Sequence, residues 1–325
     1  MEQSSSLLRF NNVSKRFRSG AAVENISFDL PSNKIIGLIG PSGSGKTTAV
    51  RLLTGIYTPT DGEIDIMGKS PQDFTTKDRV RIGYLTQHFT LFKDLSVQSN
   101  MNFAASIYGQ GFLSRRKRID ELLDMVELTD HKNKRASVIS GGMQRRLQLA
   151  ASLVHDPDII FLDEPTAGID PILRKKFWDH FESLRDQGKS LFVTTQYVSE
   201  ASYCDLVGIL VDGKLIELEP PEELRKKAFG GEILEVSPTH DFDSETLKRL
   251  GHIEGVIRVT RLHNGKIRLY VDDATTTLSP VITWFDDHEL EVEGVEHYQP
   301  PFDDVFVKLI EDYQAAQEEE VRDEA

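Results

Sequence analysis

The chain has 325 residues, enough for two domains, and its 39% hydrophobic and 28% charged residues are ordinary for a globular protein. The formal net charge of −14, from 38 Lys and Arg against 52 Asp and Glu, disfavours nucleic acid as a partner, because nucleic-acid-binding proteins usually carry a basic face. A single cysteine, Cys204, excludes an internal disulfide bond and suits a reducing compartment.

Short apolar runs alternate with helical patterns along the first two-thirds of the chain, which predicts an α/β fold with a mostly parallel central sheet. We expect the central strands at residues 34–39, 81–86, 158–162, 190–195 and 206–211. Runs bounded by glycine and proline turns predict an additional antiparallel β layer at residues 7–13, 23–30 and 63–67.

A glycine-rich segment, Gly40-Pro41-Ser42-Gly43-Ser44-Gly45-Lys46-Thr47, fits the phosphate-loop pattern G-x-x-x-x-G-K-[ST] between a predicted strand and a predicted helix. Its glycines let successive main-chain N–H groups converge on an anion, and the helix N-terminus adds its positive dipole end. We expect Lys46 to reach the β- and γ-phosphates and the Thr47 hydroxyl to bind Mg²⁺. The segment therefore predicts a site for a nucleoside triphosphate.

Helical patterns without strand signals predict a helical subdomain at about residues 96–136. The basic run 114–118 opens one of its helices. A solvated helix face is the favoured interpretation of this run, and a docking surface is the alternative.

Two adjacent carboxylates, Asp163 and Glu164, end the predicted strand at residues 158–162. We expect Asp163 to hold Mg²⁺ through water, and Glu164 to orient and polarise the water that attacks the γ-phosphate. An exposed turn after a strand would explain these residues in isolation, but the phosphate loop elsewhere in the chain favours the functional interpretation.

The run Ser140-Gly141-Gly142 begins another predicted helix and is, on its own, an ordinary N-cap. Its exposed amides also form a second anion site. Because one nucleotide does not need two such sites in one subunit, we expect a head-to-tail dimer that holds each nucleotide between the Lys46 loop of one chain and the Ser140 helix of the other.

After a hairpin at residues 212–214 and a helix starting near residue 220, the best linker candidate is Phe229-Gly230-Gly231. The later pattern is strand, helix, strand, strand, helix, strand and a closing helix, which predicts a small α+β ferredoxin-like domain. Its elements are expected at residues 233–236, 244–250, 256–262, 266–271, 278–285, 290–295 and 303–313, with an Asn264-Gly265 hairpin turn. The predicted domains are 1–229 and 232–313, followed by a frayed acidic tail at 314–325.

These motifs resemble those of the nucleotide-binding subunits of ATP-binding-cassette (ABC) transporters, over residues 7–224. Gly40–Thr47 is similar to the family's Walker A loop and Ile159–Glu164 to its Walker B strand. Ile139-Ser140-Gly141-Gly142-Met143 is similar to its Leu-Ser-Gly-Gly-Gln signature. The resemblance implies a P-loop NTPase cassette that uses ATP and Mg²⁺.

Three further roles follow from the resemblance alone. It implies that Gln87 reaches Mg²⁺ and senses a membrane partner, and that Asp170 crosses the dimer interface. It also implies that Phe17 stacks on adenine, although a lone phenylalanine can equally belong to a core. The expected nucleotide-binding residues are Phe17, Gly40, Pro41, Ser42, Gly43, Ser44, Gly45, Lys46, Thr47, Thr48, Gln87, Ser140, Gly141, Gly142, Asp163 and Asp170, of which Thr47, Gln87 and Asp163 serve the metal.

Two positions depart from the family pattern. Gln196 stands where the family usually has a histidine that contacts the γ-phosphate, and Met143 replaces the signature glutamine. Glutamine hydrogen-bonds but does not shuttle protons near pH 7, so with Glu164 orienting the water and Gln196 positioning phosphate we expect a slower ATPase. Together with Asp303-Asp304-Val305-Phe306, these departures resemble the daunorubicin-resistance-type branch of drug-export ATPases.

The favoured hypothesis is the ATPase subunit of an ABC-2-type exporter that works with separate integral membrane permease subunits and not with nucleic acid. No apolar run is long enough to span a bilayer, and Met1–Ser6 lacks the pattern of a signal peptide. We therefore expect a cytoplasmic protein, held at the inner face of the cell membrane by the permease. The alternatives are a soluble ABC ATPase acting on ribosomes or nucleic acid, an importer ATPase, and a nucleotide-gated binding module without turnover.

Overall fold

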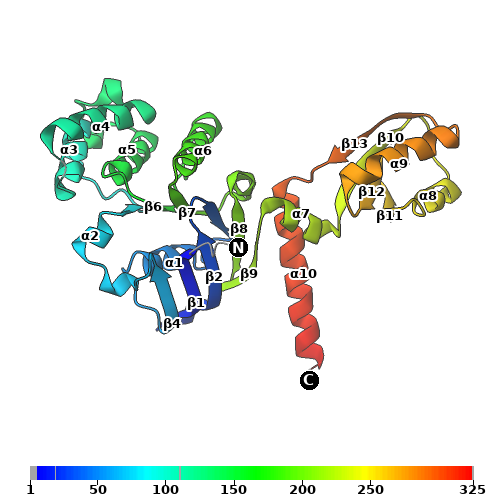
Figure 1. Cartoon of the computed structure of the whole chain (residues 1–325), viewed down its shortest axis with the longest axis horizontal. Coiled ribbons are helices and arrows are strands. Elements are labelled where there is room, and N and C mark those ends of the chain that lie inside the picture. Colours follow the sequence, from blue (N-terminus) through cyan, green and yellow to red (C-terminus); the bar gives the residue numbers. More distant parts are fainter. Residues whose placement is uncertain (1–5, 19, 110, 324–325) are drawn as a thin grey trace. The chain divides into compact units, whose positions relative to one another are not determined.

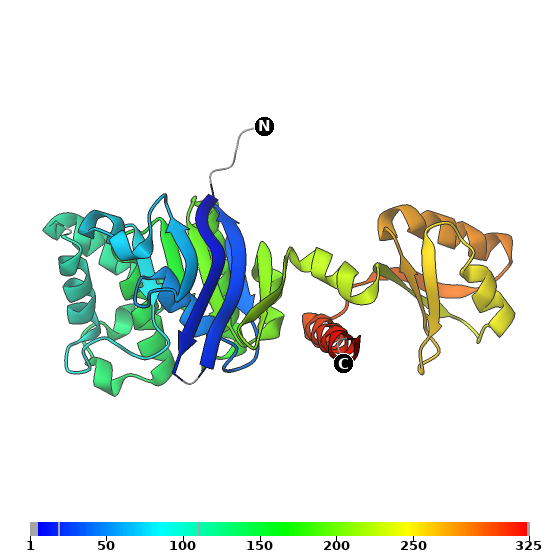
Figure 2. The same cartoon turned by 90° about the horizontal axis from the view of Figure 1, so that it is seen from below.

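The computed structural model describes residues 6–18, 20–109 and 111–323. The chain divides into two compact units, Met1–Glu219 and Pro220–Ala325 (Figures 1 and 2). The first five residues, where no signal peptide is expected, and the last two residues of the acidic tail lie outside the described ranges. None of the described helices combines the length and the apolar character needed to cross a membrane.

A six-stranded sheet organises the first unit. Its neighbouring strands are parallel except for the last pair, where the hairpin at Asp212 and Gly213 reverses the chain. Three of its middle strands are buried throughout, which explains their continuous apolar runs. In spatial order the strands are β5 (Ile82–Leu85), β6 (Ile159–Asp163), β7 (Ser190–Thr195), β3 (Ile35–Ile39), β8 (Leu206–Val211) and β9 (Lys214–Glu219). The predicted α/β fold is confirmed.

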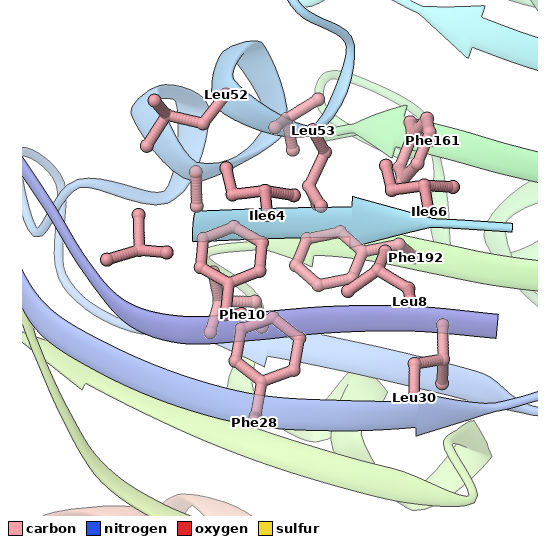
Figure 3. Close-up of a cluster of buried hydrophobic side chains, with 14 of the residues drawn as sticks. Leu8, Phe10, Phe28, Leu30, Leu52, Leu53, Ile64, Ile66, Phe161 and Phe192 are labelled. Carbon is pink, nitrogen blue, oxygen red and sulfur yellow. The ribbon is translucent and has the colours of Figure 1, made fainter. Parts of the chain in front are cut away.

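An antiparallel layer packs on this sheet. In spatial order it contains β2 (Gly20–Pro31), β1 (Ser6–Phe17) and β4 (Asp61–Ile66). Leu8 and Phe10 of β1 are buried, whereas Arg9 between them is exposed, as expected for a strand with one face in the core. Figure 3 shows Leu8 and Phe10 together with Phe161 and Phe192 of the central sheet in one apolar cluster.

Helices complete both faces of the central sheet. Helix α1 (Lys46–Leu53) contributes to the apolar cluster shared with the antiparallel layer. Helix α6 (Pro171–Asp186) packs against β7 and β3 on the opposite side (Figure 1). It buries Phe177, Trp178 and Phe181 at spacings that place them on one helix face.

The single cysteine lies in a tightly packed place after the 3₁₀ helix η4 (Val198–Tyr203). A Cβ atom added to Gly37 would lie 2.5 Å from the Cys204 Sγ atom, so only glycine fits opposite it. Burial raises the pKa of the Cys204 thiol, and the nearby charges of Glu200 and Asp205 raise it further.

The region predicted as a helical subdomain, at about residues 96–136, contains α3 (Val97–Ile107), α4 (Phe112–Met125) and η2 (Thr129–His131). It is preceded by η1 (Pro71–Asp73) and α2 (Thr76–Arg79) and followed by η3 (Ala136–Val138) and α5 (Gly141–Leu153). The buried Asn100 side chain of α3 accepts a hydrogen bond from the Phe92 N–H and donates one to the Phe92 carbonyl oxygen, at 2.9 Å each. These two bonds fix the segment that leads into α3. In the basic run at the start of α4, Arg116 and Lys117 are exposed.

The second unit contains one four-stranded sheet, and all of its pairs are antiparallel. Its elements are α7 (Pro221–Phe229), β10 (Glu232–Pro238), α8 (Ser244–Leu250), β11 (Val256–Arg261), β12 (Ile267–Val271), α9 (Ala274–Asp287), β13 (Val292–Tyr298) and α10 (Phe302–Asp323). The strand order β11-β12-β10-β13, with α8 and α9 packed on one face, is the ferredoxin-like arrangement that the sequence predicts.

Two ends of the second unit differ from the sequence-based expectation. Helix α7 packs on α10 and falls in the second unit, whereas the predicted domain 1–229 includes it in the first. The acidic tail is helical through Asp323 instead of frayed after Ala315. Alanine, glutamine and glutamate favour helix, and the pair Arg322–Glu318 has helical spacing, so helix propensity outweighs charge repulsion here.

Charged and aromatic side chains occupy the sheet face that α8 and α9 leave open. Glu235 is 5% exposed and accepts hydrogen bonds from Lys266 at 2.8 Å and Arg268 at 3.0 Å. Burial by itself raises the pKa of Glu235, but these two cations lower it more, so that its pKa lies below the ordinary value. The Arg268 guanidinium also lies 4.0 Å from the Tyr298 ring centroid.

Candidate functional site

The phosphate loop joins β3 to α1, and glycine is required at two of its positions. A Cβ on Gly40 would lie 2.1 Å from the main-chain oxygen of Leu210, and one on Gly45 would lie 2.2 Å from that of Ala22. Gly45 also has a φ of 106°, which L-residues with a side chain avoid. Main-chain atoms of β8 and β2 therefore pack closely against the loop and hold the loop amides at the start of α1.

A cleft of ≈ 240 Å³ opens beside this loop. Its lining residues come from four separate stretches of the chain and are Ala22, Ser42, Gly43, Gly45, Lys46, Thr47, Thr48, Gln87 and Glu164. The structure thus brings the predicted loop, metal-binding and water-orienting residues to one cleft. Parallel strands explain this meeting, because β3, β5 and β6 all end at the same edge of the sheet.

Lys46 is the cation of the cleft and is 5% exposed. Its Nζ atom donates to the carbonyl oxygens of Gly40 and Pro41, each at 2.8 Å. Burial lowers the pKa of Lys46, and the charges of Glu164 and Asp163 oppose that effect. A partly desolvated ammonium group that donates to these two carbonyl oxygens is well suited to exchange them for an entering phosphate.

Asp163, at the end of β6, has an arrangement that fits Mg²⁺. Its Oδ1 atom accepts hydrogen bonds from Thr194 at 2.7 Å and Thr47 at 3.1 Å. Its Oδ2 atom is buried and has no hydrogen-bond partner among the described residues. Within the same residues, no group of three or more His, Cys, Asp or Glu side chains could enclose a metal by itself. Phosphate oxygens and water would have to complete the shell, as is usual for Mg²⁺.

Glu164 turns away from β6 with a φ of 49°, a left-handed conformation that is uncommon for residues other than glycine. Its N–H donates to the Thr194 carbonyl oxygen at 3.0 Å. Its Oε2 atom accepts a hydrogen bond from Gln87 Nε2 at 3.2 Å. The turn allows Glu164 to line the cleft directly after Asp163, which the strand alternation alone would prevent.

Two residues that support the site carry no recognisable sequence motif. Thr194 is fully buried in β7 and holds Asp163 through its hydroxyl. Arg145 of α5 is 7% exposed and donates to the carbonyl oxygens of both Gln87 and Glu164. The sequence signal for Arg145 is weak: it is a charged residue four positions before buried Leu149, on a helix face that also buries Gln148.

The predicted second anion site is not part of the cleft in this chain. Ser140 caps α5 by accepting a hydrogen bond from the Met143 N–H at 3.3 Å. Cβ atoms added to Gly141 or Gly142 would meet nothing within 4 Å, so the helix start is open. Asp170 caps α6 and also lies outside the cleft lining.

Phe17 and Gln196 also lie outside the cleft lining. Phe17, at the end of β1, is 40% exposed and meets the Tyr57 ring edge-on at 5.3 Å between centroids. Lys15 Nζ lies 5.4 Å from the Phe17 centroid. An exposed ring beside another aromatic argues against a core role for Phe17 and leaves a face available for stacking. Gln196 follows β7 and is exposed.

Comparison with protein families gives a direct match. The ABC transporter family model matches residues 23–167. The daunorubicin resistance ATP-binding protein DrrA3 of Streptomyces coeruleorubidus is 32% identical over 310 residues, covering 93% of this chain and 95% of that protein. The Nod factor export ATP-binding protein I of Burkholderia lata is 31% identical and covers 81% of this chain and 86% of that protein.

A further relative is longer than this chain. The probable multidrug ABC transporter ATP-binding protein YbhF of Escherichia coli is 33% identical over 248 residues, which are 74% of this chain but 43% of that protein. This chain therefore matches less than half of the length of YbhF.

Solved structures agree in fold. A dimeric ATP-binding cassette in a post-hydrolysis state, bound to ADP and Pi, has a TM-score of 0.62 and 28% identity, and covers 66% of this chain and 98% of that one. An ATP-binding subunit of an ABC transporter has a TM-score of 0.63 at 22% identity, covering 68% of this chain and 93% of that one.

The motif resemblance and the predicted fold class are thus confirmed. Because the family model covers the phosphate loop and the Asp163–Glu164 pair, and because relatives with more than 30% identity extend over most of the sequence, the chain belongs to the ABC transporter family of ATP-binding proteins.

Proposed function

We propose that the chain is the ATP-hydrolysing subunit of an ABC-2-type exporter, acting as a homodimer with separate membrane permease subunits. The single observation that carries this proposal is the cleft in which Lys46, Thr47 and Glu164 meet, with the unpartnered Asp163 Oδ2 atom behind them. Export as the direction of transport is supported by the names of the relatives, which describe drug resistance and Nod factor export.

Each residue of the cleft has a proposed task. Lys46 and the loop amides bind the β- and γ-phosphates. Thr47, Asp163 and Gln87 hold Mg²⁺, which neutralises charge on the phosphates during transfer. Glu164 accepts a hydrogen bond from the attacking water and orients it towards the γ-phosphate.

The proposed dimer is head-to-tail. The Ser140 helix start is open and does not line the cleft of its own chain, so a second copy would use it to complete the phosphate site. Two apolar side chains near Ser140 and Asp170 are strongly exposed, Val138 at 70% and Ile172 at 76%. A partner subunit that covers Ser140 and Asp170 would also remove these two side chains from water.

The proposed contact with the permease is an apolar groove of ≈ 300 Å³ beside α3. Phe92, Phe103 and Ile107 line it and are 50%, 43% and 64% exposed. The groove also includes Thr86, the residue directly before Gln87. A permease segment that binds in this groove and displaces Thr86 would therefore also move Gln87, which lines the cleft. The proposed location of the subunit is the inner face of the cell membrane, through this contact.

A Glu164→Gln variant tests the hydrolytic proposal. Size-exclusion chromatography with light scattering should show a dimer of this variant with Mg-ATP and monomers without it, and phosphate release should be at least 100-fold below the parent. Lys46→Ala is the matched control, because it removes phosphate binding and should remain monomeric. Parent-like turnover in Glu164→Gln, or a monomer at saturating ATP, would contradict the proposal.

A Phe103→Asp variant tests the permease contact separately. It places a charge in the apolar groove, so we expect co-purification with co-expressed permease subunits to fall at least tenfold while ATP binding stays unchanged. Retained co-purification would rule out the groove as the docking site and leave the ATPase proposal intact.

A further inference from the structure

A buried guanidinium connects helix α5 to the cleft. Arg145 lies one helical turn after Gly141 and, among the described residues, donates to main-chain oxygen atoms of neighbouring segments and to Gln148 Oε1 at 3.5 Å. Nη2 donates to the carbonyl oxygens of Asp163 at 2.5 Å and Glu164 at 2.7 Å. The remaining main-chain acceptors are the carbonyl oxygens of Pro165 at 3.2 Å, Gln87 at 3.2 Å and Thr86.

This arrangement depends on arginine and not only on positive charge. Among the described residues, no carboxylate lies within ion-pair distance of Arg145, so carbonyl dipoles take the place of a counter-ion. Burial lowers the pKa of Arg145 to about 10, partly offset by the charges of Asp163 and Glu164, and the group stays protonated at neutral pH. A planar fork with five donors matches this set of acceptors, whereas a lysine ammonium has three donors at one point.

The acceptors belong to the two loops that carry the proposed chemistry. Thr86 and Gln87 follow β5, and Asp163, Glu164 and Pro165 end or follow β6, the adjacent parallel strand. The guanidinium therefore fixes the spacing of these loops at the point where Gln87 Nε2 meets Glu164 Oε2 at 3.2 Å.

One turn further along α5, a second side chain reaches the same loop. Gln148 Nε2 donates to the His88 carbonyl oxygen at 2.6 Å. Helix α5 thus holds the segment after β5 at two successive residues.

We propose that Arg145 is a positioning residue, which orients Glu164 and Gln87 together and transmits movement of α5 to both. This inference rests on the proposed roles of Glu164 and Gln87. Because Ser140 caps the start of α5, binding of a partner's nucleotide at the helix start would move the same guanidinium. A purely structural role would instead predict lower stability with an unchanged rate of ATP turnover in the folded protein.

An Arg145→Lys variant tests the proposal. Lysine keeps the charge but cannot reach carbonyls on both loops, so we expect kcat to fall roughly 10- to 100-fold, as is typical when a reacting group is misplaced by about 1 Å. The KM for ATP should change less than threefold, because Arg145 contacts neither Lys46 nor the loop amides.

The neighbouring Arg146→Lys variant is the matched control. Arg146 lies on the same helix and also donates to carbonyl oxygens, those of Val126 at 3.0 Å and Glu127 at 3.4 Å, but these lie away from the cleft. Its kcat should stay within twofold of the parent. An equal loss in both variants would overturn the proposal.

A double variant separates positioning from a general disturbance. If Arg145 acts through Glu164, then Arg145→Lys should cause no further loss of residual turnover in the Glu164→Gln background. An additional tenfold loss there would overturn the proposal. Parent-like turnover in Glu164→Gln alone would contradict the role of Glu164, whereas inactive Glu164→Gln with parent-like Arg145→Lys would contradict the role of Arg145 only.

A variant on the next turn covers the case in which Arg145→Lys fails to fold. Gln148→Met preserves the length of the side chain and releases the His88 carbonyl, while the guanidinium loses its 3.5 Å bond to Gln148 Oε1 but keeps its main-chain acceptors. We expect its kcat to fall about three- to tenfold, with circular dichroism and the KM for ATP close to those of the parent. An unchanged kcat would count against the connection between α5 and the Gln87 loop.

Discussion

Thr194→Val should loosen the proposed Mg²⁺ site without changing the shape of the core. Thr194 is fully buried, and its hydroxyl donates to Asp163 Oδ1 at 2.7 Å and accepts from the Glu164 N–H at 3.2 Å. Valine has nearly the same shape but no hydroxyl. Asp163 would keep only the longer bond from Thr47, while the Glu164 N–H would keep the Thr194 carbonyl.

The expected magnitude follows from the charge of the acceptor. A hydrogen bond to an ionised group contributes about 1.5–3 kcal/mol, so the free energy of unfolding should fall by about that amount. If the loss of this hydrogen bond weakens the binding of Mg²⁺ by about 1.4 kcal/mol, the Mg²⁺ concentration for half-maximal turnover rises about tenfold. Turnover at saturating Mg²⁺ should change less, because Glu164 keeps its main-chain bond.

The assay is phosphate release at saturating ATP over a series of free Mg²⁺ concentrations, together with urea unfolding. Thr195→Val is the matched control, because Thr195 is 1% exposed in the same strand but accepts from the Tyr197 N–H, away from Asp163. An unchanged Mg²⁺ requirement in Thr194→Val, or an equal shift in Thr195→Val, would refute the reasoning.

Three further outcomes are expected. Gly40→Ala places a Cβ 2.1 Å from a carbonyl oxygen and should weaken ATP binding at least tenfold by calorimetry, whereas Gly43→Asn meets no atom near its Cβ and suits a φ of 84°, so it should weaken binding less. Glu235→Gln should lower the stability of the second unit by about 2 kcal/mol in urea at pH 7. Because the folded-state pKa of Glu235 lies below its ordinary value of 4.5, this stabilisation is complete above that pH and is lost as the pH falls through the folded-state pKa; a difference between parent and variant that persists there would contradict the assignment. For Gln196, replacement by histidine should raise the rate of phosphate release and replacement by alanine should lower it, and unchanged rates in both variants would exclude a role for this residue.

Local patterns explain how much of the fold could be predicted. The alternation of Leu8, Arg9 and Phe10 matches a strand with one buried face, and the continuous apolar run of β6 matches a strand buried on both. The phosphate loop can be recognised in the sequence because its glycines and Lys46 follow a fixed spacing. The close approach of main-chain oxygen atoms at Gly40 and Gly45 explains why glycine is required there. The roles of the predicted site residues stay predictions.

Tertiary contacts explain what could not be predicted. The main acceptors of Arg145 are main-chain carbonyl oxygens, which every residue type provides, so no side-chain pattern in the sequence predicts these contacts. Thr194 is likewise indistinguishable in sequence from any other threonine in a strand. The sequence underestimates the length of α10, because the acidity of its end predicts disorder whereas the helix propensity of the same residues predicts helix. Helix α7 joins the second unit by packing on α10, a tertiary contact that no local pattern predicts.

The sealed environment of Cys204 has a practical consequence. Cys204 is 7% exposed and its thiol resists ionisation, so thiol-directed probes should leave it unreacted under native conditions. Cysteines introduced at exposed positions such as 138 and 172 would then be the sole attachment points for spin labels, with no need to remove the natural one. Distances between the spin labels of two molecules can thus be measured in an otherwise unaltered chain, with and without bound nucleotide.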